Sequence, residues 1–159
     1  MDDGSANQQK STFDKQGLTM NDNFFELEVQ IGSRQDYQQI KEWDEFWGDR
    51  RQELQGGELF TARNGTECIG YVKIVPSGFL HYPFISILCT KPTARKRGVA
   101  STLIKHVHYV WRGSKIFTTT EEDNPDMRSL LKTIGYREVG YVSNVNATEV
   151  RELIYCVDA

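Results

Sequence analysis

One stretch of the chain, residues 84–103, constrains the fold more than any other. It begins with the nearly continuous apolar run Phe84–Cys89, which is typical of a strand covered on both faces. Pro92 cannot extend that strand, and apolar residues at helical spacing then predict a helix that begins near Gly98. We therefore expect a central buried strand that is followed at once by an amphipathic helix.

The link between this strand and this helix contains basic residues followed by small ones. Arg95, Lys96 and Arg97 are consecutive, and Gly98 and Ala100 follow them. Small residues let a ligand approach the backbone, while free amide groups and the helix dipole favour an anion at a helix start. Basic side chains pair with phosphate oxygens, so a pyrophosphate group fits this segment. The alternative is a solvated basic loop.

Several classes of protein are disfavoured by what the chain lacks. It contains neither the G-x-x-x-x-G-K-[ST] loop of nucleotide triphosphatases nor the G-x-G-x-x-G turn of dinucleotide-binding folds. The net charge of -3 and the pI near 5.6 argue against a nucleic-acid partner. No apolar run reaches the roughly 20 residues of a membrane helix, and the acidic start, residues 1–5, does not resemble a secretory signal. We expect a cytoplasmic protein without a membrane partner.

At 159 residues the chain is long enough for one domain. The polar composition of residues 1–22 predicts a flexible tail, and we place the single domain at residues 23–159. Periodicity and turn residues, including the hairpin pair Asn64-Gly65, predict the elements of that domain. Strands are expected over 25–31, 58–63, 67–75, 84–89, 116–120, 136–142 and 149–157, and helices over 34–47, 49–54, 98–112 and 124–134.

The segment Arg95-x-x-Gly98-x-Ala100 resembles the acyl-CoA motif [RQ]-x-x-G-x-[GA] of the GNAT N-acetyltransferase superfamily. Residues 130–136 also resemble the family's L-Y-x-K-x-G-[FY] ending, and the resemblance covers about residues 24–158. It implies an α/β (α+β) fold, with a mixed, mostly antiparallel sheet of about seven strands flanked by helices. In that fold the fourth and fifth strands splay apart.

The resemblance also implies a binding site and a co-substrate, acetyl-CoA, without a metal. Acetyl-CoA would lie in the wedge between the splayed strands. The family pattern, carried over to this sequence, assigns the pantetheine to Leu88, Cys89 and Thr90, the pyrophosphate to Arg95, Lys96, Arg97, Gly98, Val99, Ala100 and Ser101, and a place beside the ligand to Asn124.

The implied reaction is direct transfer of acetyl to an amine, on a small molecule, a peptide or a protein. A general base is needed, and Glu121, Glu122 and Glu152 are the nearest carboxylates by expected topology, with a water relay as the alternative. Leu131 stands where the family has the tyrosine that protonates the leaving thiolate. Tyr136, water or the ammonium's own proton would then serve as the acid.

The departure at Leu131 motivates a second function, a non-catalytic acyl-CoA-binding or regulatory module on the same fold. Oligomeric state stays open between a monomer and a homodimer. The aromatic residues Tyr37, Trp43, Phe46 and Trp47 belong either to the core or to an acceptor pocket.

Histidine and cysteine residues carry no further site in the sequence. His106 and His108 are two residues apart on a helix and face different ways, so a shared metal ion is not expected. Cys68, Cys89 and Cys156 are expected as small buried side chains, because free cysteine is usually buried.

Overall fold

The computed structural model describes residues 27–46 and 48–159, so the predicted tail over 1–22 lies outside the described residues. Seven strands form one mixed sheet in the order β1-β2-β3-β4-β5-β7-β6. The expected fold class is confirmed. The strands are β1 (Leu27–Ile31), β2 (Leu59–Asn64), β3 (Glu67–Phe79), β4 (Tyr82–Thr90), β5 (Lys115–Glu121), β6 (Arg137–Val142) and β7 (Glu152–Asp158). The helices are α1 (Arg34–Ile40), α2 (Arg51–Gly56), α3 (Val99–Val110) and α4 (Pro125–Ile134), with a 3-10 turn η1 at Pro92–Ala94.

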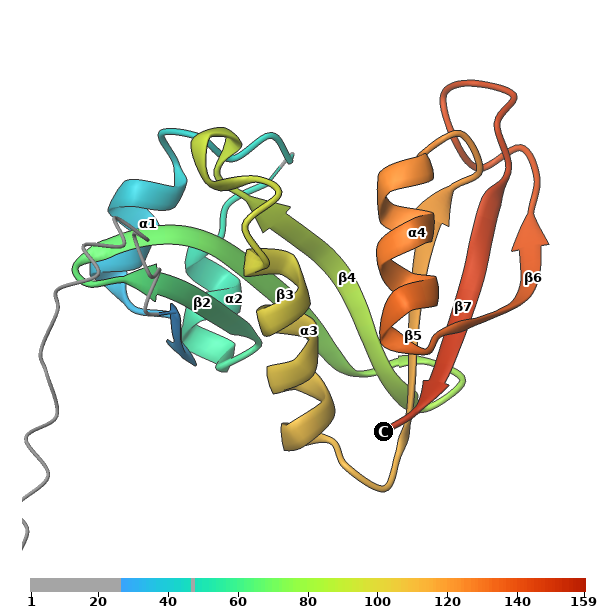
Figure 1. Ribbon diagram of the computed structural model, residues 1–159, viewed down its shortest axis with the longest axis horizontal. Coiled ribbons are helices and arrows are strands. Elements are labelled where there is room, and N and C mark those ends of the chain that lie inside the picture. The colour runs from blue at the N-terminus through green and yellow to red at the C-terminus, as the bar shows by residue number, and fades with distance from the viewer. Residues whose placement is uncertain (1–26, 47) are drawn as a thin grey trace, which may run out of the picture.

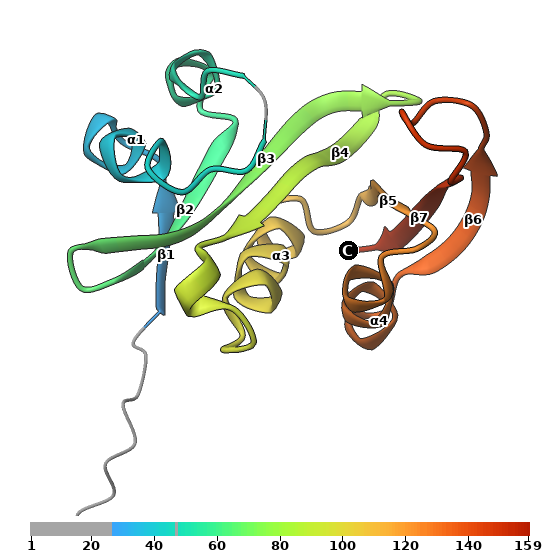
Figure 2. The ribbon, with the colours of Figure 1, turned by 90° about the horizontal axis from the view of Figure 1, so that it is seen from above.

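The helices cover the sheet on both faces. Figure 2 shows α1 and α2 on one face and α3 and α4 on the other. The larger apolar cluster joins α3 and α4 to the sheet, with Leu103, Ile116 and Leu131 fully buried. A smaller cluster lies under α1 and α2 and contains Ile40 and Tyr71. All three cysteines are buried free thiols, as expected. None of the described helices is long and apolar enough to cross a membrane.

The centre of the sheet opens between β4 and β5. These strands run parallel but pair only at Phe84 with Phe117 and at Ile85 with Thr118. β4 continues to Thr90, so its last five residues have no partner on the β5 side, and the two ribbons diverge in Figure 1. β3 satisfies the other edge of β4 up to Thr90. The wedge therefore exposes one backbone edge of β4.

The first helix ends earlier than predicted. A capping box between Ser33 and Asp36 starts α1, and α1 stops at Ile40 rather than at residue 47. Asp44 then binds the side chains of Arg50 and Tyr71, which holds the chain in an irregular loop beyond the helix end. Helical periodicity alone did not reveal these long-range bonds.

The third strand is longer than predicted. Pro76 and Gly78 lie inside β3, at a register shift between Val75 and Phe79, which is a place where a sheet tolerates proline. The chain reverses instead at Leu80 and His81, whose φ angles are 49° and 66°.

Candidate functional site

A cleft of about 450 Å³ opens at the end of β4, and we call it the cradle cleft. The residues around it come from the end of β4, the link to α3, the first turn of α3, one side of α4 and the loop after α1. They are Glu45, Phe46, Leu88, Cys89, Thr90, Ala94, Arg95, Lys96, Gly98, Val99, Ala100, Ser101, Asn124, Asp126, Met127 and Leu130.

Every residue that sequence analysis assigned to cofactor binding lines this cleft, with one exception. Arg97 is not among the lining residues, because the chain turns at Lys96 (φ 62°) and again at Gly98 (φ 82°). The basic run is therefore not a continuous phosphate-facing surface. Arg95 and Lys96 face the cleft instead.

The start of α3 is built to leave backbone amides available. Gly98 is the N-cap residue, in the left-handed region, and no side chain caps this end of the helix. The first N–H groups of a helix have no partner within the helix. Those of Val99, Ala100 and Ser101 are at the wall of the cleft, beside the positive end of the helix dipole. This end of α3 can accept an anion.

The two basic side chains of the cleft already contact acidic side chains. Arg95 donates to Glu45 at 2.7 Å and to the carbonyl oxygen of Thr90 at 3.3 Å. Lys96 forms an ion pair with Asp126 of α4 at 2.7 Å. Both pairs are exposed, so water and salt weaken them and an incoming phosphate can replace the carboxylates.

Cys89 lies at the wall of the cleft but is not arranged as a nucleophile. Burial raises the pKa of its thiol to about 11, so the unreactive protonated form dominates at neutral pH. Cys89 packs in the smaller core cluster with Tyr71 and Ile40. Cys89 therefore contributes to the cleft through the volume of its side chain and through its backbone groups.

A second cleft of about 380 Å³ adjoins the first. We call it the acidic cleft because, among the described residues, the only charged ones that line it are Glu121 and Glu152. It lies in the wedge between β4 and β5. It shares Phe46, Leu88, Asn124 and Met127 with the cradle cleft, and its remaining lining residues are Ile85, Ser86, Ile87, Thr118, Thr119, Thr120, Glu121, Asn146 and Glu152.

The three carboxylates named as base candidates have different surroundings. Glu121 and Glu152 line the acidic cleft. Glu122 lines neither cleft, and both of its oxygens accept hydrogen bonds from Arg151. That guanidinium lowers the pKa of Glu122, which makes the carboxylate a weaker base.

The structure places Tyr136 away from both clefts. Tyr136 follows the turn at Gly135 (φ 104°), is buried behind α4, and its hydroxyl lies 3.1 Å from His108 Nε2. Burial raises the pKa of the phenol further above its ordinary value. We therefore withdraw Tyr136 as the acid for a thiolate in the cradle cleft.

The face of α4 that lines the clefts carries no tyrosine among its lining residues, which are Asp126, Met127 and Leu130. Asn124 caps α4 by accepting a hydrogen bond from the Met127 N–H at 3.1 Å, and both residues line both clefts. Leu130 lines the cradle cleft, whereas Leu131 is fully buried in the larger core cluster. A tyrosine at position 131 would have to enter that core.

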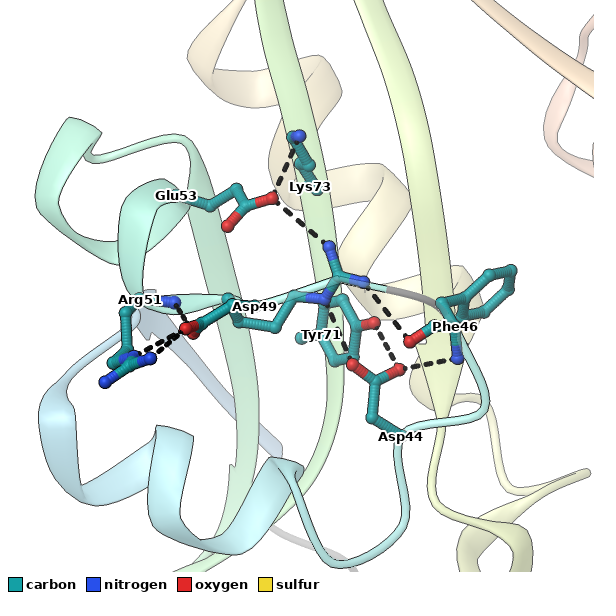
Figure 3. Close-up of polar contacts among 8 residues, drawn as sticks. Asp44, Phe46, Asp49, Arg51, Glu53, Tyr71 and Lys73 are labelled. Carbon is teal, nitrogen blue, oxygen red and sulfur yellow. Dashed lines mark hydrogen bonds and ion pairs between the residues drawn. The ribbon is translucent and has the colours of Figure 1, made fainter.

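Sequence analysis missed a buried polar network that supports the wall between the clefts (Figure 3). Asp44 accepts hydrogen bonds from the Tyr71 hydroxyl at 2.6 Å and from Arg50 Nε at 3.0 Å. Arg50 also pairs with Glu53 at 3.2 Å, and Glu53 accepts from Lys73 at 3.0 Å. The side chains of Arg50 and Asp44 are only 3% and 9% exposed.

This network fixes the backbone of Phe46 on both sides. The Phe46 N–H donates to Asp44 at 3.1 Å, and its carbonyl oxygen accepts from Arg50 at 3.4 Å. Phe46 is 46% exposed and lines both clefts. Of the aromatic residues left between two roles, Phe46 therefore belongs to the pocket, Trp43 packs against Tyr71, and Trp47 lies outside the described residues. The concentration of acidic and basic residues in 44–53 was the only signal in the sequence.

Histidine, cysteine, aspartate and glutamate residues do not cluster into a metal site within the described ranges. No group of three or more of them there has the arrangement that would hold an ion. His106 instead packs against Phe60, with ring centroids 5.0 Å apart.

Comparison with known proteins identifies the family. The model of the acetyltransferase (GNAT) family matches residues 22–136, and the chain therefore belongs to that family. A search among curated proteins found no match. The resemblance noted in the sequence is thus confirmed, and with it acetyl transfer as the general activity.

Solved structures share the fold over most of the chain. A GNAT-family acetyltransferase from Bacillus cereus is 25% identical, with a TM-score of 0.71 over 83% of this chain and 96% of that one. Arabidopsis thaliana Naa50, in complex with the bisubstrate analogue CoA-Ac-MVNAL, is 16% identical, with a TM-score of 0.68 over 82% and 97%. An aminoglycoside 6'-N-acetyltransferase complexed with coenzyme A is 16% identical, with a TM-score of 0.63 over 81% and 95%.

Proposed function

We propose that this protein transfers an acetyl group from acetyl-CoA directly to an amine acceptor. The observation that carries the proposal is that the cradle cleft and the acidic cleft meet at Phe46, Leu88, Asn124 and Met127. A thioester held in the first cleft and an amine held in the second would come into contact at that junction. Direct transfer needs this proximity and no covalent enzyme intermediate.

The cradle cleft is suited to the parts of acetyl-CoA. The pyrophosphate would accept hydrogen bonds from the backbone amides at the start of α3 and from the side chains of Arg95 and Lys96. The pantetheine amides would pair with the backbone edge of β4 between Leu88 and Thr90, which β5 leaves free. Two relatives of the same fold were crystallised with coenzyme A or a bisubstrate analogue of it, which supports this choice of co-substrate.

Glu121 is the general base in this proposal. It lies at the end of β5 in the acidic cleft, and no basic side chain pairs with its carboxylate among the described residues. A carboxylate in that position can take a proton from the attacking ammonium, directly or through one water molecule. Glu122 is the poorer candidate because Arg151 occupies it.

The leaving thiolate takes its proton from water in this proposal. The lining side chains of the clefts that come from α4 are Asn124, Asp126, Met127 and Leu130, none of which is a tyrosine. A thiol has an unperturbed pKa of about 8.5, so its conjugate base leaves without a strong acid. This feature predicts that kcat depends little on any single side chain acting as the proton donor to the thiolate.

The test is acetyl-CoA turnover, followed as thiol release, across primary amines with the purified protein. We expect amine-dependent thiol release and an acetylated product by mass spectrometry. Acetyl-CoA binding at micromolar concentration without turnover of any amine would replace this proposal with a non-catalytic acyl-CoA-binding module.

A further inference from the structure

We propose that the acidic cleft selects small acceptors that carry a second positive charge, beyond the amine that is acetylated, and that Glu152 pairs with this second charge. The inference deepens the proposed function and rests on it. It concerns the class of acceptor, which the family does not specify.

The two clefts differ in the charges that line them. The cradle cleft contains Arg95 and Lys96 opposite Glu45 and Asp126. The acidic cleft contains two carboxylates, and none of the lysine, arginine or histidine residues that the structure describes lines it. An acceptor that reaches the junction from this side therefore enters a negative field, which attracts cations and repels anions.

The two carboxylates are held next to each other by strand pairing. Glu121 of β5 and Glu152 of β7 are directly opposite in the antiparallel register, so their side chains leave the same face. Like charges at opposite positions destabilise a sheet. No ion pair within residues 27–46 and 48–159 involves either carboxylate, while the neighbouring Arg151 is taken by Glu122. A bound cation would offset this repulsion.

The side chain of Glu152 is held in one orientation by a hydrogen bond. Asn146, in the loop before β7, donates to Glu152 Oε2 at 3.0 Å and to the carbonyl oxygen of Val150 at 3.2 Å. Asn146 itself lines the acidic cleft. One oxygen of Glu152 is thus held by the loop, and the other has no partner among the described residues.

A threonine hydroxyl at the wall of the same cleft is available to a ligand. Thr120 is only 6% exposed and lines the acidic cleft, yet its side chain makes no hydrogen bond to any described residue. Its neighbour Thr118, by contrast, donates to the Ile85 carbonyl at 3.0 Å. Among the described residues, the fully buried side-chain polar atoms without a partner are Trp43 Nε1, Glu53 Oε2 and Thr61 Oγ1. The Thr120 oxygen is not one of these, so it is still reached by solvent. An N–H donor of an acceptor can therefore bind this oxygen in place of water.

The size of the cleft sets the size of the acceptor. About 380 Å³ is at the lower end of the range of small-molecule sites. Phe46 closes one side of it, on a loop that Asp44 and Arg50 hold in place. We therefore commit to a small aliphatic diamine or polyamine as the acceptor class, rather than a peptide chain.

The experiment compares three acceptors with four carbon atoms each: 1,4-diaminobutane, butylamine and 4-aminobutanoate. Each is supplied with acetyl-CoA to the full chain, and thiol release gives kcat/KM. We expect the diamine to exceed butylamine at least tenfold, which corresponds to about 1.4 kcal/mol, and 4-aminobutanoate to be the poorest acceptor. Raising the salt concentration should reduce the ratio of diamine to butylamine, because ions screen the attraction.

Glu152→Gln tests the assigned residue. We expect the ratio of kcat/KM between the diamine and butylamine to fall toward one in this variant. The matched control is Glu149→Gln, which makes the same change of charge at an exposed residue of the neighbouring loop, outside the cleft. The control should keep the wild-type ratio.

Binding separates this inference from the proposed function. Calorimetry on the CoA-saturated protein measures the affinity for the diamine and for butylamine without any turnover. A tenfold preference for the diamine that Glu152→Gln abolishes supports the inference even if no amine is acetylated. Equal affinities or equal kcat/KM values for the two amines would overturn it, and so would faster turnover of a short neutral peptide than of the diamine.

Discussion

The cradle cleft and the acidic cleft share four lining residues and similar volumes, but they are assembled in different ways. Most of the cradle cleft comes from one continuous segment, residues 88–101. The acidic cleft combines β4, β5, the start of α4, the loop before β7, the first residue of β7 and the loop after α1. The proposed site for the co-substrate is thus built mostly from local sequence, whereas the proposed site for the acceptor depends on segments that meet only in the folded protein.

The largest expected effect concerns the wall that both clefts share. Arg50→Leu removes the cation between Asp44 and Glu53 and leaves two buried carboxylates without it. We expect the free energy of unfolding to fall by about 3–5 kcal/mol, as for other broken buried ion pairs. Denaturant unfolding measures this change.

The control for this experiment is the adjacent residue. Arg51→Leu breaks the exposed pair with Asp49 and should leave the denaturation midpoint unchanged. Equal denaturation midpoints for Arg50→Leu and Arg51→Leu would show that the buried polar network does not stabilise the shared wall of the clefts.

The next effect is specific to the acidic cleft. Glu121→Gln removes the proposed base, and we expect kcat to fall about 100-fold, near the lower limit for loss of a general base. Affinity for CoA, measured by calorimetry, should stay unchanged because the residue lies outside the cradle cleft. Glu122→Gln is the matched control, and a larger loss of kcat in Glu122→Gln than in Glu121→Gln would reverse our assignment.

The third effect is specific to the cradle cleft. In Gly98→Val a branched side chain must adopt φ near 82° and would project at the anion-binding amides. We expect CoA binding to weaken at least tenfold, or about 1.4 kcal/mol. Gly113→Val is the control, because Gly113 has the same φ, also has open space around it, and lies at the far end of α3. If both variants bind CoA equally well, the amides at the start of α3 are not the phosphate site.

The smallest effect concerns the ion pair that crosses from the loop after α1 to the cradle. Glu45 forms an ion pair with Arg95, and this pair must break when a phosphate binds to Arg95. Glu45→Gln should therefore raise the affinity for CoA about threefold, within the range of exposed ion pairs. Glu67→Gln breaks the exposed pair with Lys91, outside both clefts, and should not change the affinity. A weaker affinity in Glu45→Gln would mean that Glu45 positions Arg95 rather than competes for it.

Sequence patterns predicted the order of the described strands and α-helices but not the 3-10 turn η1, and the errors in the predicted bounds have a common physical cause. The predictions of where α1 ends and where the chain turns after β3 were wrong, because long-range contacts decide both positions. Asp44 is held by Tyr71, 27 residues away, and the register shift in β3 is set against β4. Periodicity records which face of an element is buried, but not the partner that ends it.

In the candidate site, too, local features were predictable from the sequence and features set by tertiary packing were not. Gly98 was predictable because left-handed backbone and a free helix start are local properties, and Arg95 was predictable because it is near Gly98 in sequence. The exclusion of Arg97 from the cleft and the burial of Leu131 depend on the direction of side chains after packing. Tyr136 was misplaced for this reason as well.

By itself, the sequence determined the family, the order of strands and α-helices, and the uncapped start of α3 at Gly98, because periodicity, glycine and charge act over a few neighbouring residues. Only the tertiary structure decided that β4 and β5 separate after Ile85, that Glu121 lies opposite Glu152, and that Phe46 lies between the two clefts. Strand register and buried ion pairs join residues that are tens of positions apart. Their energies depend on the whole sheet being formed.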